Sequence, residues 1–346
     1  MGSTVELGLD TFGDVTVGLD GERLEDAQVI RDVVAQGVLA DRVGVDFFGV
    51  GEHHRDDFAV SSPETVLAAI AASTERIRLG SAVTVLSSDD PVRAFQRFST
   101  VDAISNGRAE AIVGRGSFTE SFPLFGFDLA DYEVLFDEKL DLFAKLASGQ
   151  AVTWSGTKRS ALHGAVVHPR LERAPLTTWV AVGGSPESVI RAAHHGLPLM
   201  LAIIGGEPAR FEPFVRLYRQ ALEKFGKPLD TPVGVHSPGH IADTDEDAVE
   251  QYWPHYRAMS DRIGRDRGWP PLTREAFEDG VAHGALHVGS PETVARKIAD
   301  TVRAVGADRF DLKYSAGTLP HDRSMRAIQL YGTVVVPRVR ELLADG

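Results

Sequence analysis

Two adjacent histidines follow a glutamate in the segment Glu52-His53-His54. An imidazole titrates near neutral pH, so it can move a proton, orient a bound ring or ligate a metal ion. Neighbouring residues of an extended segment point to opposite faces, and two adjacent histidines therefore rarely ligate one ion. No HExxH or His-x-His pattern completes a set of metal ligands. We therefore expect no metal here, with one packed and one exposed histidine as the structural alternative to a functional pair.

A second segment, residues 182–188, could bind an anion. It reads as the end of a strand that runs into the first turn of a helix, where free amides and the helix dipole favour negative charge. Because Pro186 has no N–H, the donors must come from its neighbours. The candidate phosphate-binding residues are Gly183, Gly184, Ser185 and Ser188. An ordinary capped helix start is the alternative, since the similar segment 288–292 shows that the motif alone is not diagnostic.

A third candidate, Arg115, stands between Gly114 and Gly116 at the end of an apolar run. Flanking glycines allow the backbone to approach a ligand closely, and a guanidinium offers forked donors suited to phosphate or carboxylate. A tight turn with a surface arginine is the alternative.

Composition narrows the chemistry. The 346 residues include no cysteine, which excludes disulfides, thiolate nucleophiles and Cys-ligated metal sites. The formal net charge of −13 argues against nucleic acid and anionic membranes as partners. No run of about 18 apolar residues and no signal-peptide pattern is present, so we expect a cytoplasmic protein. The sequence also has no G-x-S-x-G elbow or Walker loop, although a metal-dependent hydrolase barrel stays open as a rival.

The elements that must position these residues alternate between short apolar runs and longer amphipathic ones. Eight such units in one chain favour a closed (β/α)8 TIM barrel over an open, doubly wound sheet, and we expect one domain spanning residues 1–346. The predicted strands are Val5–Leu9, Asp46–Val50, Ile77–Val85, Ala109–Gly114, Thr178–Val182, Pro198–Ile203, Val233–Ile241 and Arg309–Lys313.

Amphipathic segments between these strands predict the helices, several of which start at proline. They are Gln28–Val43, Pro63–Ser73, Pro91–Ile104, Tyr132–Leu146, Pro208–Phe225, Pro291–Val305, one that opens at Pro186, and Ser324–Leu343 with a kink at Pro337. Two stretches are too long for simple connections, Phe118–Leu176 after strand four and Ser237–His287 after strand seven. We expect these insertions to build the substrate pocket or its cover.

Several segments, taken together and in order, resemble the bacterial-luciferase-like flavin monooxygenases. They are Gly-Glu-His-His at 51–54, the stretch from Leu79 to Arg93, Ser-Asn-Gly-Arg at 105–108, Val-Gly-Arg-Gly at 113–116 and Gly-Gly-Ser-Pro-Glu-Ser at 183–188. The resemblance runs from about Val5 to Leu342 and implies a TIM barrel that binds reduced FMN or the deazaflavin F420.

The resemblance also implies roles for individual residues. His53 would lie beside the flavin ring with Glu52 supporting it, and both would be catalytic. Ala82 and Val83 would lie where the family often has a non-prolyl cis peptide under the ring, and Thr84 would also be a cofactor-binding residue. The phosphate would be held by Arg115, Gly183, Gly184, Ser185 and Ser188.

The activity that the resemblance implies is a two-component monooxygenase. A separate NAD(P)H-dependent flavin reductase would supply reduced FMN, and O2 would provide the oxygen atom that enters a small organic substrate. A homodimer is also implied. The alternatives are an F420-dependent hydride-transfer enzyme in the same fold and a non-catalytic flavin-binding protein. The sequence does not distinguish either of them from the monooxygenase.

Overall fold

A computed structural model describes residues 5–18 and 20–344 of the chain. Eight parallel strands close into a barrel, because β10 pairs with both β9 and β12. This confirms the predicted TIM barrel and rules out the open sheet. The barrel strands, in order, are β1 (Glu6–Thr11), β2 (Phe47–Val50), β3 (Arg78–Ser81), β5 (Ala109–Gly114), β8 (Thr177–Val182), β9 (Leu199–Ala202), β10 (Val233–Ile241) and β12 (Arg309–Lys313).

Two short strands extend the barrel at its rim. β4 (Thr84–Val85) pairs with β5, and β11 (His287–Gly289) pairs with the end of β10. The single strand predicted for Ile77–Val85 is therefore wrong in one respect. It is two strands, β3 and β4, with Ala82 and Val83 between them.

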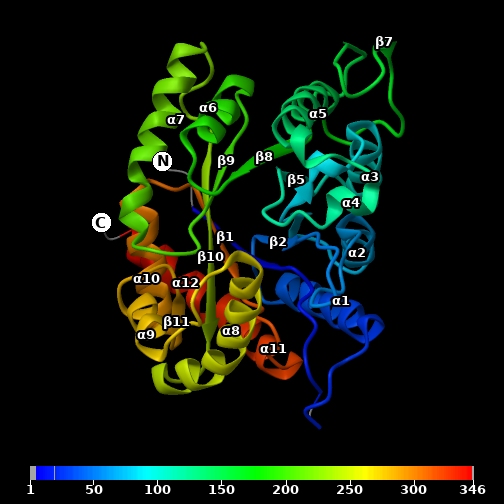
Figure 1. Ribbon diagram of the computed structural model, residues 1–346. Helices are drawn as coiled ribbons and strands as arrows, with labels where there is room; N and C mark the ends of the chain where they lie inside the picture. Colours follow the sequence, from blue (N-terminus) through cyan, green and yellow to red (C-terminus); the bar gives the residue numbers. More distant parts are fainter. Residues whose placement is uncertain (1–4, 19, 345–346) are drawn as a thin grey trace.

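Helices surround the strands on all sides (Figure 1). Several begin where a polar residue precedes a proline. In α3, for example, the Asp90 side chain accepts hydrogen bonds from the amides of Val92 and Arg93. The helices outside the insertions are α1 (Asp26–Arg42), α2 (Pro63–Ala71), α3 (Pro91–Ile104), α6 (Pro186–His195), α7 (Glu212–Lys224), α10 (Pro291–Val305), α11 (His321–Leu330) and α12 (Val336–Ala344), with 3-10 turns η1 (Leu86–Ser88) and η3 (Pro208–Phe211).

The C-terminal helix differs from the single kinked helix predicted for Ser324–Leu343. A π-helical turn, η4 (Tyr331–Val335), separates α11 from α12. Pro337 has no N–H to donate to the carbonyl four residues earlier, so the regular hydrogen-bond ladder cannot pass this point. The wider π turn precedes the proline, and the break therefore starts earlier than predicted.

Two longer segments leave the barrel. After β5 the chain forms α4 (Ser121–Phe125), η2 (Leu129–Asp131), α5 (Tyr132–Ala147) and the antiparallel hairpin of β6 (Val152–Trp154) and β7 (Leu162–Ala165). After β10 it forms the long helix α8 (Asp245–Arg267) and α9 (Arg274–Ala282) before β11. None of the helices in the described part of the chain is long and apolar enough to cross a membrane.

Arg309 of β12 occupies the interior of the barrel and is fully buried. Its guanidinium carbon lies 3.4 Å from the centre of the Phe47 ring. Its Nε donates to both carboxylate oxygens of Asp311 at 2.9 and 3.0 Å, and Nη1 donates to Glu110 at 2.8 Å. Two buried carboxylates and an aromatic face therefore compensate one buried cation.

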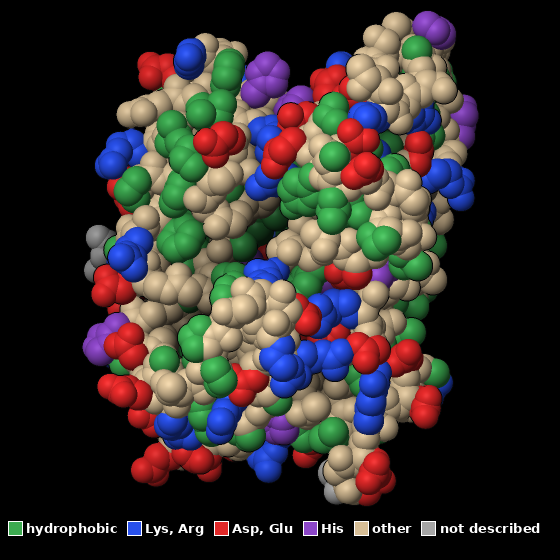
Figure 2. All heavy atoms as spheres, viewed as in Figure 1, with side chains coloured by type: hydrophobic (Ala, Val, Ile, Leu, Met, Phe, Trp, Pro, Cys, Tyr) green, Lys and Arg blue, Asp and Glu red, His purple; other side chains and the backbone are tan. Residues whose placement is uncertain are grey.

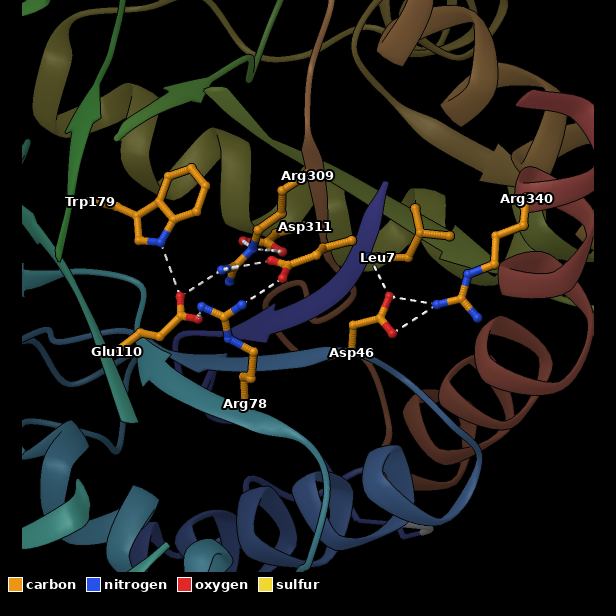
Figure 3. A network of polar contacts seen from close by, with 9 residues as sticks. Leu7, Asp46, Arg78, Glu110, Trp179, Arg309, Asp311 and Arg340 are labelled. Carbon is orange, nitrogen blue, oxygen red and sulfur yellow. Dashed lines mark hydrogen bonds and ion pairs between the residues drawn. The ribbon is translucent and has the colours of Figure 1, made fainter. Parts of the chain in front are cut away.

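Neighbouring strands extend this interior network (Figure 3). Glu110 also accepts a 3.0 Å hydrogen bond from the indole of Trp179 and forms an ion pair with Arg78. Space for these large groups comes from glycine. A Cβ atom at Gly8 would lie 2.1 Å from a carboxylate oxygen of Asp311, and one at Gly80 would lie 2.8 Å from the Phe47 ring. Nothing in the apolar pattern of the strands predicts this charged layer.

We expect Arg309→Met to destabilise the protein by about 3 to 5 kcal/mol, because it leaves Asp311 buried without its cation and Glu110 with Arg78 in place of two cations. Denaturant unfolding measures the difference. The matched control is Arg296→Met on the exposed surface of α10, where the arginine pairs with Glu292 one turn away, and we expect a loss under about 0.5 kcal/mol. Equal losses in the two variants would contradict the interior role of Arg309.

Candidate functional site

The loops that follow the C-terminal ends of the eight barrel strands form what we call the mouth of the barrel. In TIM barrels this end carries the active site. Gly51, the first residue after β2, donates to the carbonyl of Thr11 at 2.8 Å and lies against Phe12. A Cβ atom at Gly51 would lie 2.5 Å from the Phe12 ring, so glycine lets the two loops meet.

His53 lies in an aromatic enclosure at the mouth. Its ring packs at 4.3 Å from Phe58 and meets Phe12 and Phe118 edge-on at 5.1 and 5.0 Å between ring centres. Only 12% of its side chain is exposed, and its Nδ1 lies 3.6 Å from a carboxylate oxygen of Glu120. Burial raises the pKa of Glu120, but His53 and backbone donors together lower it by more than burial raises it. The net shift of the Glu120 pKa is therefore downward. The imidazole therefore faces an ionised carboxylate.

Glu52 does not support His53 as expected. One of its oxygens accepts from Nε2 of His54 at 2.8 Å, and the other accepts from the amide of Val85 at 2.8 Å. The side chains of an extended segment alternate between its two faces. Glu52 therefore shares a face with His54, two residues away, and not with its neighbour His53. Both histidines are largely buried, so the alternative of one packed and one exposed histidine is also wrong.

Ala82 and Val83 connect β3 to β4 through a cis peptide bond, as the resemblance implied. The amide of Ala82 donates to the carbonyl of Val50 at 2.8 Å, which holds this connection beside the end of β2. Thr84 is fully buried, and its hydroxyl donates to Glu64 at 3.3 Å. The Thr84 hydroxyl is therefore engaged with Glu64, and its contact with a cofactor stays a prediction.

The residues predicted to bind phosphate meet at the N-terminus of α6. Ser185 caps this helix, its hydroxyl lies 2.8 Å from that of Ser188, and it accepts from the Ser188 amide at 3.3 Å. Gly184 has a φ of +100°, a conformation that L side chains rarely adopt. Among the described residues, apart from Gly183 itself and its two chain neighbours, no heavy atom lies within 4 Å of a Cβ placed at Gly183, so this turn has room for a ligand.

Arg191, which the sequence reasoning missed, joins this group from the same helix. Its Nη1 lies 3.4 Å from the Ser188 hydroxyl. The signal that could have found it is the spacing of three residues from Ser188, which places both side chains on one face of α6. Arg191 also pairs with Asp137 and, at 2.9 Å, with Glu133 of α5.

Arg115 approaches the same carboxylate from the end of β5. It pairs with Glu133 and lies over the ring of Tyr132. Glu133 is 57% exposed and lies between two guanidinium groups that come from different parts of the chain. We call Arg115, Arg191, Ser185 and Ser188 the anion cradle. Its two guanidinium groups converge on the carboxylate of Glu133, and Arg191 also lies beside the Ser188 hydroxyl, so the group suits a phosphate.

Figure 2 shows a hollow on this face, between the side formed by α6 and α7 and the side formed by α4 and α5. Arg191 and Glu133 come from the two helices on either side of it. Within residues 5–18 and 20–344, no group of three or more His, Asp and Glu side chains is placed to hold a metal ion. The chemistry available here is anion binding at the cradle and proton transfer at His53.

Known proteins share this architecture. The 4-hydroxyprotoasukamycin monooxygenase of Streptomyces nodosus subsp. asukaensis is 27% identical over 315 residues, which cover 86% of this chain and 84% of the relative.

Two solved structures superpose over nearly the whole chain. The oxygenating constituent of 3,6-diketocamphane monooxygenase from Pseudomonas putida, in complex with FMN, has a TM-score of 0.74 at 20% identity and covers 96% of this chain and 98% of its own. The coenzyme F420-dependent tetrahydromethanopterin reductase from Methanopyrus kandleri has a TM-score of 0.73 at 18% identity and covers 97% and 99%. At these identities the likeness shows the fold.

The model of one protein family, described as luciferase-like monooxygenase, matches residues 11–309. That range runs from the end of β1 to the start of β12 and includes His53, the Ala82-Val83 connection and the whole anion cradle. The chain therefore belongs to the luciferase-like monooxygenase family and is an oxidoreductase enzyme.

Proposed function

We propose that this enzyme is a flavin-dependent monooxygenase that uses reduced FMN and O2 to oxygenate a small organic substrate. A separate NAD(P)H-dependent flavin reductase would supply the reduced FMN. We further propose a homodimer, as the resemblance implies, in the cytoplasm, as the hydropathy of the sequence led us to expect. The observation that carries the proposal is the convergence of Arg115 and Arg191 on one carboxylate beside the N-terminus of α6.

This arrangement fits the terminal phosphate of FMN. A phosphate monoester carries close to two negative charges at neutral pH, and two guanidinium groups with hydroxyl and amide donors match that charge. Glu133 occupies the position of an anion between the arginines and would give way to the phosphate. The residues that would hold the phosphate are Arg115, Gly183, Gly184, Ser185 and Ser188, together with Arg191.

FMN, when bound in its reduced form, would supply the electrons that activate O2. The chain's own residues would position the reactants and control protons and water. The rings of Phe12, Phe58 and Phe118 would exclude water from His53. Glu120 would orient the imidazole through Nδ1, which leaves Nε2 to exchange a proton with the bound reactants. Glu52 would act indirectly, by holding His54 and Val85.

F420-dependent hydride transfer is the second candidate, and it is supported by a structural likeness to an F420-dependent reductase as strong as that to the FMN complex. The matching family model is described as luciferase-like monooxygenase, and two converging arginines suit the doubly charged phosphate of FMN. We therefore favour FMN. The family match favours an enzyme over a non-catalytic flavin-binding protein.

We expect Arg191→Ala to weaken binding of reduced FMN by tenfold to about a hundredfold, because a charge-assisted contact to the phosphate is lost. Riboflavin, which has the same ring but no phosphate, should bind wild type and variant equally. Anaerobic fluorescence titration with both ligands measures this. Arg216→Ala is the matched control, since Arg216 is exposed on α7 and pairs with Glu212 of the same helix.

Glu133→Gln provides the opposite test of the cradle. The substitution removes the internal competitor, so affinity for FMN should rise or stay level while affinity for riboflavin is unchanged. If Arg191→Ala weakens both ligands equally, or weakens neither, the cradle does not hold the phosphate.

We expect His53→Ala to change the rate at which O2 reoxidises bound reduced FMN by about tenfold or more, since a positioned acid–base group typically contributes at least that much. Stopped-flow absorbance measures the rate and needs no knowledge of the substrate. Riboflavin and FMN affinities should stay within a few-fold of wild type. His163→Ala on the exposed hairpin strand β7 is the control. If the wild-type protein and His53→Ala are reoxidised at the same rate at every pH between about 6 and about 9, His53 takes no part in the chemistry.

A further inference from the structure

A second histidine faces the interior side of the mouth and is part of no motif in the sequence. His236 lies in the middle of β10, opposite Asp311 of β12 and Ala202 of β9 in the strand register. Its Nδ1 lies 2.7 Å from a carboxylate oxygen of Asp10, which belongs to β1 and is 1% exposed. β10 and β1 are not neighbours, so the pair spans the barrel interior above the charged layer of Arg309.

The hydrogen bond fixes which nitrogen carries the proton. A carboxylate can only accept, so Nδ1 donates to Asp10 and Nε2 is left as the second ring nitrogen. Within residues 5–18 and 20–344, the hydrogen bond of the His236 ring is the one from Nδ1 to Asp10 and none involves Nε2, and the side chain keeps 13% of its surface exposed. This is the arrangement in which a buried carboxylate orients an imidazole and stabilises its cationic form.

Phe12 connects this pair to the site already described. Its ring is stacked on that of His236 with 6.0 Å between centres and an angle of 9°, and it meets His53 edge-on at 5.1 Å. The two imidazoles thus lie on either side of one phenylalanine at the end of β1. They belong to the same mouth.

We propose that Asp10 and His236 form a second acid–base pair of the active site, in which His236 binds an oxygen anion of the organic substrate through Nε2 and protonates it. The substrate would carry an enolate or phenolate oxygen at the stage when the proton is needed. In this step the Nε2–H bond breaks, an O–H bond forms on the substrate, and the neutral imidazole keeps its Nδ1–H on Asp10. Solvent then returns the proton to the ring, whose side chain is 13% exposed.

The charged groups around His236 favour this role. They are Asp10 of β1 and Asp311 and Lys313 of β12, whereas β9 presents Ala202. Burial lowers the pKa of His236, but Asp10, with help from Asp311, raises it more, and the net pKa lies above the ordinary value. The effect of Lys313 is weakened because its ammonium lies 3.1 Å from Asp14. The imidazolium therefore persists to higher pH than in an ordinary histidine, and is lost as the pH rises through the raised pKa.

The proposal rests on the proposed function only for the claim that cofactor and substrate bind at this mouth. Its first test needs no ligand. In the free protein, NMR titration of the histidine rings, with His236→Gln to assign the signal, should give His236 a pKa above about 6.5 with Nδ1 protonated. Asp10→Asn, which keeps the shape of the side chain, should lower that pKa by about one unit or more. A pKa that Asp10→Asn does not change would overturn the pairing.

The second test asks whether His236 faces the cofactor. Diethyl pyrocarbonate acylates neutral imidazole nitrogens, and mass spectrometry measures its rate at each histidine of the wild-type protein. Saturating FMN should slow modification of His236 by about tenfold or more, while exposed His163 stays unaffected. If FMN binds in an independent titration and His236 is not protected, this inference fails and the proposed function stands. If FMN does not bind, the proposed function fails, and the NMR titration still decides whether the pair exists.

Discussion

A buried guanidinium holds the centre of this barrel together. Arg309 contacts Glu110 and Asp311 with short hydrogen bonds and lies against the face of Phe47, and these four groups come from three different strands. Such a cation can be buried only if its carboxylates are in place, and they are in place only when the strands pair in one register. The glycines of β1 and β3 leave the space that this register requires. The network thereby specifies how the sheet closes.

The functional groups lie at the mouth of this barrel, in two regions. On one side, β5 and β8 end at Arg115 and at the turn before α6, so segments far apart in sequence deliver the anion cradle to one place. On the other side, β1, β2 and β10 present Phe12, His53 and His236 around one another. A flavin nucleotide has the same two parts, a phosphate at one end and a reactive ring at the other. The correspondence is the physical basis for assigning cofactor and substrate to this mouth.

The sequence was sufficient for the barrel and for most of the backbone that forms the site. Continuous apolar runs predict buried parallel strands, and proline preceded by a polar residue predicts helix starts, because both signals depend on local chemistry. The loops that carry His53, Ala82-Val83, Arg115 and Ser185 were found for the same reason. Side-chain partners were not predictable in this way. The carboxylate that faces His53 belongs to Glu120, 67 positions later in the sequence. Glu52 contacts His54 instead, because side chains alternate between the two faces of an extended segment.

The charged interior and the Asp10–His236 pair were missed for a related reason. Each depends on contacts across the barrel between strands that are distant in sequence, and a single Arg309 or His236 in an apolar strand carries no pattern of its own. Arg191 is a milder case, since its spacing from Ser188 on α6 was visible and only its approach to Glu133 required the fold. Sequence patterns therefore located the elements, and the tertiary structure assigned the partners.

Anaerobic titration of the purified protein with reduced FMN and, separately, with reduced F420 tests the central claim most directly, and each complex is then mixed rapidly with O2. The account predicts that reduced FMN binds more tightly than reduced F420, and that O2 reoxidises the bound FMN at a rate different from that of FMN free in solution. Preference for F420 with no reaction toward O2 would move the enzyme to hydride transfer. Failure of both cofactors to bind would contradict the anion cradle and the functional assignment that depends on it.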